Sequence, residues 1–160
     1  MNPMTYSEEH TLSCPLHARY KKLVSAILIN EGAHKTPFTS EQGIDLDQYE
    51  VEINRSGNRD NTVDFCIGLT TRELLLVEAK LNVAKPQNIG KAHLENKIRH
   101  SVELLRELDL TVAKQKVLLF DKSVVNVAKR HIITTLFRNN PNATANLLVY
   151  TVQEFKENCF

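Results

Sequence analysis

Two apolar segments joined by a short turn constrain the fold of this chain more than any other part of its sequence. Residues 62–69 (TVDFCIGL) and 73–80 (ELLLVEAK) are rich in the β-branched, aromatic and large aliphatic side chains that favour strands. The Thr-Thr-Arg turn at residues 70–72 is short, so the two strands are expected to pair antiparallel. The segment therefore predicts a β-hairpin in the core of a sheet.

Apolar periodicity predicts the elements around this hairpin. In chain order they are a helix over residues 15–32, a loop over 34–48, a strand over 49–53, a turn over 54–61, the hairpin itself, a helix over 87–108, a strand over 114–120, a helix from about 121 to 136 and a strand over 146–152. Three consecutive strands form an antiparallel meander, whereas the later strand–helix–strand unit requires a crossover and favours parallel strands. The predicted fold class is α/β: a mixed β-sheet flanked by helices on both faces, with an α-β-β-β-α-β core and an added helix and strand.

Length and composition indicate one globular domain over residues 1–160. The 160 residues, 42% hydrophobic and 24% charged, suffice for a core without disulfide or metal support. No apolar run is long enough to cross a bilayer, and no basic segment followed by an apolar one marks a secretory leader. Cys14, Cys66 and Cys159 lack metal-ligand spacing, so we expect free thiols in a reducing compartment and a cytoplasmic location.

Three charged side chains interrupt the apolar hairpin: Asp64, Glu78 and Lys80. Burying such groups without partners is costly, and a purely structural hairpin would avoid that cost. Because side chains alternate along a strand, Glu78 and Lys80 point to one face of the sheet. Ala79 points to the other face and leaves its carbonyl near the site. Asp64 lies in the preceding strand and meets Glu78 if the two strands pair near that end.

The chemistry of these groups is that of a metal site. Two carboxylates and a backbone carbonyl are hard oxygen ligands, which suit Mg²⁺ (or Mn²⁺) together with waters and a substrate phosphate. A neighbouring lysine can orient or deprotonate an attacking water, or neutralise charge that builds on a scissile phosphate. Asp64, Glu78 and the Ala79 carbonyl are therefore the expected metal ligands, and Asp64, Glu78 and Lys80 the expected catalytic residues.

The arrangement resembles the PD-(D/E)XK nuclease superfamily, which has the restriction-endonuclease-like fold. The resemblance covers the α-β-β-β-α-β core, at about residues 13–120, and depends on Asp64 with the triplet Glu78-Ala79-Lys80. It implies that the aspartate and the glutamate bind a divalent metal and that the lysine assists the attacking water. The expected activity is that of a metal-dependent endo- or exonuclease acting on nucleic acid, with DNA favoured. In a chain this short, structure-selective or loosely specific cleavage, or action as a homodimer, is expected.

The sequence departs from the family pattern in two respects. Val63 stands where the family motif has a proline before the aspartate. Some members add a glutamate from the middle of the first helix, where this chain has His17, Tyr20 and Lys21. The carboxylates left as candidates for a third ligand are Glu31, Glu52, Glu8 and Glu9.

The triplet alone is a weak signal, because Glu95-Asn96-Lys97 and Glu154-Phe155-Lys156 match it equally well. Only Glu78-Ala79-Lys80 ends an apolar strand, follows a strand that bears an aspartate and precedes a long helix. Two alternatives remain open. One is a noncatalytic nuclease-like fold that serves as a nucleic-acid-binding or protein-interaction module. The other is an unrelated α/β protein in which the triplet is the solvated end of a strand.

Charge is distributed unevenly along the chain, although the net charge is only +1. Between residues 41 and 78, acidic residues outnumber basic ones by nine to three, and between residues 80 and 100 basic residues outnumber acidic ones by five to one. An acidic focus with basic flanks suits a metal-dependent enzyme that acts on a polyanion, but solvated helix faces scattered in space account for the charge pattern equally well. Gln87, Lys91 and Lys97, which follow the catalytic strand, are the expected substrate-binding residues.

Overall fold

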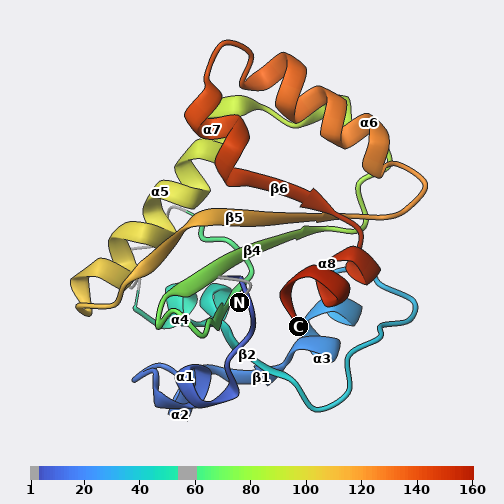
Figure 1. The fold of residues 1–160 in the computed structure, drawn as a ribbon. Coiled ribbons are helices and arrows are strands. Elements are labelled where there is room, and N and C mark those ends of the chain that lie inside the picture. Colours follow the sequence, from blue (N-terminus) through green and yellow to red (C-terminus); the bar gives the residue numbers. More distant parts are fainter. Residues whose placement is uncertain (1–3, 54–60) are drawn as a thin grey trace.

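The computed structural model describes residues 4–53 and 61–160 and shows an α/β fold built on a mixed β-sheet (Figure 1). Within these residues the sheet has six strands in the order β1-β2-β3-β4-β5-β6. The strands are β1 (Lys21–Leu23), β2 (Gln42–Asp45), β3 (Phe65–Gly68), β4 (Leu74–Lys80), β5 (Val112–Phe120) and β6 (Leu147–Tyr150). Antiparallel pairing joins β1 through β4, and β5 and β6 extend the sheet parallel to β4. No helix in the described part of the chain is long and apolar enough to cross a membrane.

The predicted hairpin is confirmed and forms the middle of the sheet as β3 and β4. Phe65 lies opposite Val77, and Gly68 lies opposite Leu74. Arg72 adopts the left-handed conformation, with a φ of 66°, in the turn between the strands. The predicted parallel crossover is confirmed as well, since the chain returns through α5 (Lys91–Glu107) from β4 to β5.

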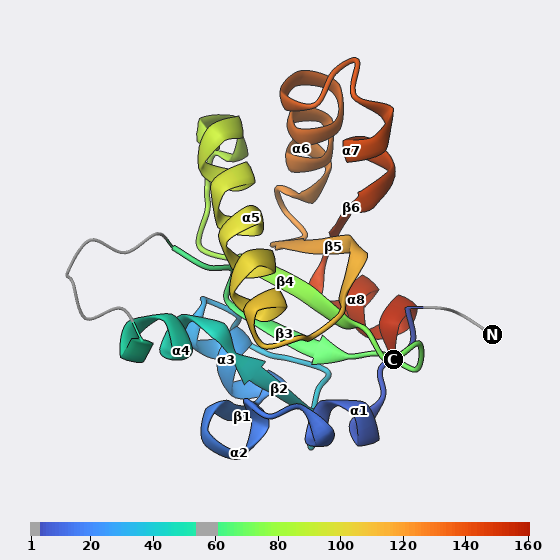
Figure 2. The same ribbon diagram turned by 90° about the vertical axis from the view of Figure 1, so that its left-hand side faces the viewer.

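Helices cover both faces of the sheet, as predicted (Figures 1 and 2). Besides α5 they are α1 (Glu8–Ser13), α2 (His17–Tyr20), α3 (Val24–Asn30), α4 (Leu46–Ile53), η1 (Pro86–Asn88), α6 (Val125–Arg130), η2 (His131–Leu136), α7 (Pro141–Asn146) and α8 (Val152–Cys159). On one face, α3 and α8 pack against odd-numbered residues of β4 such as Val77. On the other face, α4 and α5 pack against even-numbered residues such as Leu76. The alternation along β4 therefore directs Glu78 and Lys80 to the face that α5 covers.

The helix predicted over residues 15–32 is interrupted by an edge strand. α2 ends at Tyr20, β1 pairs with β2, and α3 begins at Val24. Pairing of β1 with β2 gives this part of the backbone the hydrogen bonds that a helix would otherwise provide. Leu23, which the helical period assigned to the core, is 42% exposed.

The strand predicted over residues 49–53 is wrong, because these residues belong to α4. The alternation that suggested a strand does not match burial, since Glu50 is buried and Val51 is exposed. Glu50 is tolerated inside because the His100 Nε2 atom lies 2.9 Å from its Oε2 atom. The first strand of the meander is β2 instead, inside the segment 34–48 that was predicted to be a loop.

The second half of the chain follows the predicted order, with differences at the ends of elements. α5 begins at Lys91 after the short 3₁₀ turn η1, and the π-helical η2 continues α6. α7 occupies the segment that was predicted to end the preceding helix. A capping box formed by Thr151 and Glu154 starts α8, where the sequence suggested the end of a strand. The turn predicted over residues 54–61 falls almost wholly outside the described residues.

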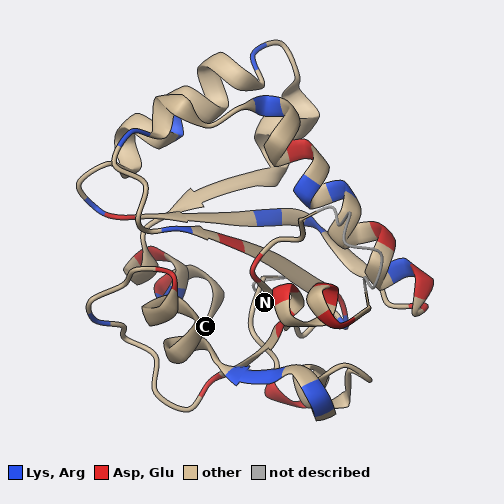
Figure 3. Cartoon of the chain, turned by 180° about the vertical axis from the view of Figure 1, so that it is seen from behind, with Lys and Arg blue, Asp and Glu red and all other residues tan. Residues whose placement is uncertain are grey.

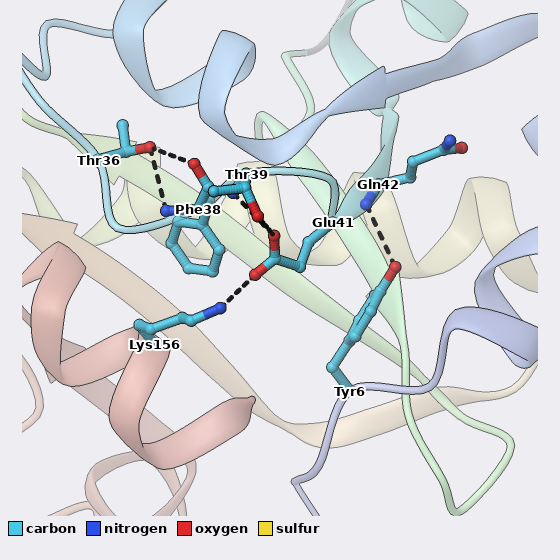
Figure 4. A network of polar contacts seen from close by, with 7 residues as sticks. All are labelled: Tyr6, Thr36, Phe38, Thr39, Glu41, Gln42 and Lys156. Carbon is cyan, nitrogen blue, oxygen red and sulfur yellow. Dashed lines mark hydrogen bonds and ion pairs between the residues drawn. The ribbon is translucent and has the colours of Figure 1, made fainter.

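A polar network joins the segment between α3 and β2 to the C-terminal helix (Figure 4). The Glu41 carboxylate accepts hydrogen bonds from the Lys156 ammonium of α8 and from the Thr39 N–H. The Lys156 ammonium also lies 5.1 Å from the centroid of the Phe38 ring. Because this segment continues from Glu31 at the end of α3, the network holds the chain that borders the predicted site.

Candidate active site

The register of β3 and β4 brings Asp64 and Glu78 side by side. Asp64 directly precedes β3. The next residue, Phe65, lies opposite Val77, so residue 64 falls opposite Glu78. The Asp64 Oδ2 atom accepts a hydrogen bond of 2.6 Å from the Ala79 N–H. In a strand, the N–H and C=O groups of one residue point to the same side, so the Ala79 carbonyl is directed toward Asp64 as well.

Two lysines face the Glu78 carboxylate, whose side chain is only 1% exposed. The Lys97 ammonium of α5 lies 2.5 Å from Glu78 Oε2, and the Lys80 ammonium lies 3.4 Å from the same oxygen. The second carboxylate oxygen, Oε1, is buried and has no hydrogen-bond partner among the described residues. Figure 3 shows the acidic and basic bands of β4 beside one another. The structure thus places Lys80 at the predicted site and adds Lys97 to it.

Asp64 and Glu78 interact as a pair of carboxyl groups. Burial, followed by the charge of Glu78 and a hydrogen bond to it, raises the pKa of Asp64 to about 9, against the opposing effect of the Ala79 N–H. Burial and the neighbouring Glu78 charge therefore favour the protonated form of Asp64.

A third carboxylate, Glu31, reaches this pair from the end of α3. Its side chain hydrogen-bonds to Asp64 and lies close enough to Glu78 to respond to its charge. Burial, and then the Glu78 charge, raises the pKa of Glu31 above its usual value. Of the four glutamates that the sequence offered for a third ligand, Glu31 is the one that the structure brings to the site.

The other three glutamates lie elsewhere. Glu52 accepts a hydrogen bond from the Tyr20 hydroxyl and pairs with Arg19. Glu8 and Glu9 belong to α1, which packs against the opposite end of β3 from Asp64. Sequence reasoning did not favour Glu31, because it placed that residue at the end of one continuous helix. The break at β1 makes α3 a separate helix with its own direction.

Polar contacts join α5 to the segment before β3 and to α4, and so fix the position of this helix at the site. The Ser101 hydroxyl donates to the Lys97 carbonyl at 2.7 Å and accepts from the Val63 N–H at 2.9 Å. One residue earlier, His100 pairs with the buried Glu50 of α4. None of these supporting contacts was predicted. The sequence signal was only that Lys97 and Ser101 lie one helical turn apart, on the same side of α5.

The structure does not bring the other two expected substrate-binding residues to the carboxylates. Gln87 is exposed on η1, and Lys91 is exposed in the first turn of α5. The Lys91 ammonium lies 3.8 Å from the Glu95 carboxylate and 5.6 Å from the centroid of the Phe137 ring. Their role in substrate binding stays a prediction.

The carboxyl groups at the site are oxygen donors of the kind that a hard divalent cation binds. Their negative charge is balanced by the Asp64 proton and by the ammonium groups of Lys80 and Lys97. In residues 4–53 and 61–160, no three His, Cys, Asp or Glu side chains are already spaced around a common metal position. Glu31, Asp64 and Glu78 nevertheless form a continuous row of carboxyl groups. Loss of the Asp64 proton would leave excess negative charge in this row, which a hard divalent cation would neutralise through oxygen ligands. The residues therefore fit a metal whose binding displaces a proton.

Comparisons of the chain with protein-family models, with curated proteins and with solved structures find no match.

Proposed function

We propose that this protein is a metal-dependent nuclease that hydrolyses phosphodiester bonds, with DNA as the favoured substrate. The observation that carries the proposal is the convergence of Asp64, Glu78 and Lys80 where two central strands meet. Buried clusters of titratable groups cost stability, and functional sites are where proteins retain them. If the triplet were merely the solvated end of a strand in an unrelated α/β protein, Glu78 would be exposed. Its side chain is only 1% exposed.

The order of the elements supports membership of the PD-(D/E)XK nuclease superfamily. α3, β2, β3, β4, α5 and β5 follow one another in the α-β-β-β-α-β order of that core, with an antiparallel meander and then a parallel strand. α4 is an insertion between the first two strands of this core, and β6 extends the sheet beyond β5. The triplet Glu78-Ala79-Lys80 ends the third strand and is followed by the long helix, as the family pattern requires.

Each residue of the site would have a separate role in hydrolysis. A Mg²⁺ or Mn²⁺ ion held by Asp64, Glu78 and the Ala79 carbonyl would polarise the scissile phosphate and acidify the attacking water. Lys80, at the open end of the strand, orients that water and neutralises charge on the phosphate as the bond breaks. Glu31 adds a third carboxylate on the α3 side. Lys97 balances Glu78 before the cation enters and keeps its carboxylate in position.

A noncatalytic binding module is the second candidate, and one contact favours it. The Lys97–Glu78 ion pair, at 2.5 Å, would satisfy this carboxylate permanently if it were a structural salt bridge. Titration calorimetry with Mn²⁺ separates the two candidates. Heat of binding in the wild type that is lost in Glu78→Gln supports the nuclease. Absence of binding in both supports the module.

The decisive experiment is cleavage of mixed single- and double-stranded DNA and RNA with Mg²⁺ or Mn²⁺. The Glu78→Gln variant keeps the shape of the side chain and should lose cleavage, because it removes one metal ligand. The matched control is Glu157→Gln, which alters an exposed glutamate of α8 outside both the site and its flanking helix and should leave the rate unchanged. Equal rates for the wild type and Glu78→Gln would rule out the proposed site.

A further inference from the structure

A second group of cations lines a cavity apart from the three carboxylates. The cavity has a volume of about 510 Å³ and lies between α5, β5 and α7. Besides Glu95, the polar residues that line it are Arg99, Lys114, Lys116, Asn140, Asn142 and Asn146. Figure 3 shows the basic bands of β5 that contribute to this region, close to α5.

The carboxylate that lines this cavity does not neutralise its two lysines. Glu95 is already paired, since its carboxylate lies 3.8 Å from the Lys91 ammonium. The Lys116 ammonium donates a hydrogen bond of 2.7 Å to the Lys114 carbonyl, which provides no countercharge. Among the residues that the structure describes, no carboxylate forms an ion pair with either of these two lysines.

Lys116 is half-buried and has further positive charge nearby. Burial, and then the charge of Arg106, lowers the pKa of Lys116 below its usual value. Arg99 donates a hydrogen bond to the neutral Asn96 side chain, and its contact with the Glu103 carboxylate is long, at 3.9 Å, and exposed. Placing a partly desolvated cation beside like charges opposes folding. An anion bound in the cavity would remove this cost.

The asparagines add neutral hydrogen-bond donors on the α7 side. The Asn140 Oδ1 atom accepts from the Ala143 N–H at 3.1 Å, so the amide nitrogen is the end of this side chain that remains a donor. Side-chain amides bind both phosphate oxygens and the edges of bases. Lysine and arginine on one wall and amides on the other match the chemistry of a nucleotide.

We propose that this cavity binds a backbone phosphate of the nucleic acid, away from the phosphate that is cleaved. The identity of this ligand rests on the proposed nuclease function. Lys116 lies opposite Leu76, and Leu118 lies opposite Glu78. The two sites are therefore offset by two residues along the strands, about 7 Å, on the same face of the sheet. A nucleic-acid strand that crosses α5 reaches both sites.

The test measures binding of a fluorescein-labelled single-stranded DNA oligonucleotide to the full chain in EDTA, where no cleavage occurs. The double variant Lys114→Ala/Lys116→Ala should weaken binding roughly tenfold or more. It should also lower the slope of log affinity against log salt by about 1.4, from two contacts of about 0.7 each. The control Lys129→Ala/Arg130→Ala removes the same charge from the exposed end of α6, outside the cavity, and should do neither.

The outcomes that would overturn the proposal are distinct. Unchanged affinity and slope in the cavity variant, or an equal loss in the α6 control, would place binding elsewhere. Lys116→Arg keeps the charge and must retain binding, so a loss in that variant would mean that Lys116 has only a structural role. Competition by polyglutamate but not by inorganic phosphate would assign the cavity to an acidic protein partner. An oligonucleotide that binds through the cavity yet is never cut with Mg²⁺ or Mn²⁺ would leave the cavity assignment standing and remove the nuclease.

Discussion

Replacement of Lys97 by methionine removes the closest countercharge of Glu78 and retains most of the aliphatic stem. Removing one partner of a buried ion pair typically costs about 3–5 kcal/mol, because the other charge stays buried. Here the Lys80 ammonium remains 3.4 Å from the same Glu78 oxygen and offsets part of the loss. The side chain of Lys97 is 14% exposed, so screening by water is limited. We therefore expect Lys97→Met to lower the free energy of unfolding by about 2–3 kcal/mol.

Urea denaturation at pH 7 of a double-mutant cycle measures this interaction directly. In the Glu78→Gln background the Lys97→Met change should cost less than about 1 kcal/mol, because no carboxylate is left unpaired, which gives a coupling energy of about 2 kcal/mol. Lys91→Met is the matched control. Its partner Glu95 lies 3.8 Å away on the same helix, and both side chains are about half exposed. This control should cost less than about 0.5 kcal/mol.

The same cycle links stability to the proposed metal site. If Glu78 is a metal ligand, Mn²⁺ should restore part of the stability that Lys97→Met loses, because a cation replaces the missing ammonium. Additive losses in the cycle would show that the ion pair does not hold Glu78, and the account of the site would be wrong. Coupling without any effect of Mn²⁺ would retain the ion pair and favour the noncatalytic module.

Three further predictions concern other parts of the site and its border. Lys80→Ala should reduce cleavage by roughly 10²–10⁴-fold with Mn²⁺ binding retained, as measured by single-turnover kinetics and calorimetry. Glu31→Gln should weaken Mn²⁺ binding, whereas Glu52→Gln, which alters a glutamate outside the site, should not. Burial raises the pKa of Glu41, but the hydrogen bond from Lys156, two backbone N–H hydrogen bonds and the Lys156 charge together lower it to about 2. Because this value lies below the unfolded-state value of 4.5, the stabilisation is present above pH 4.5 and is lost as the pH falls toward 2. Lys156→Met should therefore lose about 1–2 kcal/mol at pH 7 and less in acid, as measured by denaturation at each pH.

The parts of the fold that sequence predicted are those in which local pattern and burial agree. β3 and β4 are apolar on both faces and joined by a short turn, so neither strand had an alternative arrangement. α4 was missed because its pattern disagrees with its burial. Glu50 lies inside, where the His100 side chain contacts its carboxylate, and Val51 lies outside. That contact joins residues far apart in the chain, and no local period reports it.

In the candidate site too, residues placed by local pattern were predicted, and residues placed by contacts between distant parts of the chain were not. The proximity of Asp64, Glu78 and Lys80 was predicted because the hairpin register follows from the turn between their strands. Glu31 and Lys97 depend on the directions of α3 and α5 relative to the sheet, which the sequence did not determine.

The position of α5 gives the two proposed sites a common physical basis. Lys97 lies on one side of this helix, against Glu78, while Arg99 lines the cavity beside β5. Residues two positions apart on a helix, such as Lys97 and Arg99, are separated by about 200° of rotation. One helix can therefore present opposite sides to the two sites. Ser101 bonds to the Val63 N–H and limits rotation of α5 about its own axis. A change at this contact should therefore disturb both sites together. Ser101→Ala is expected to weaken Mn²⁺ binding and oligonucleotide binding in parallel, whereas an effect on one alone would show that α5 does not couple them.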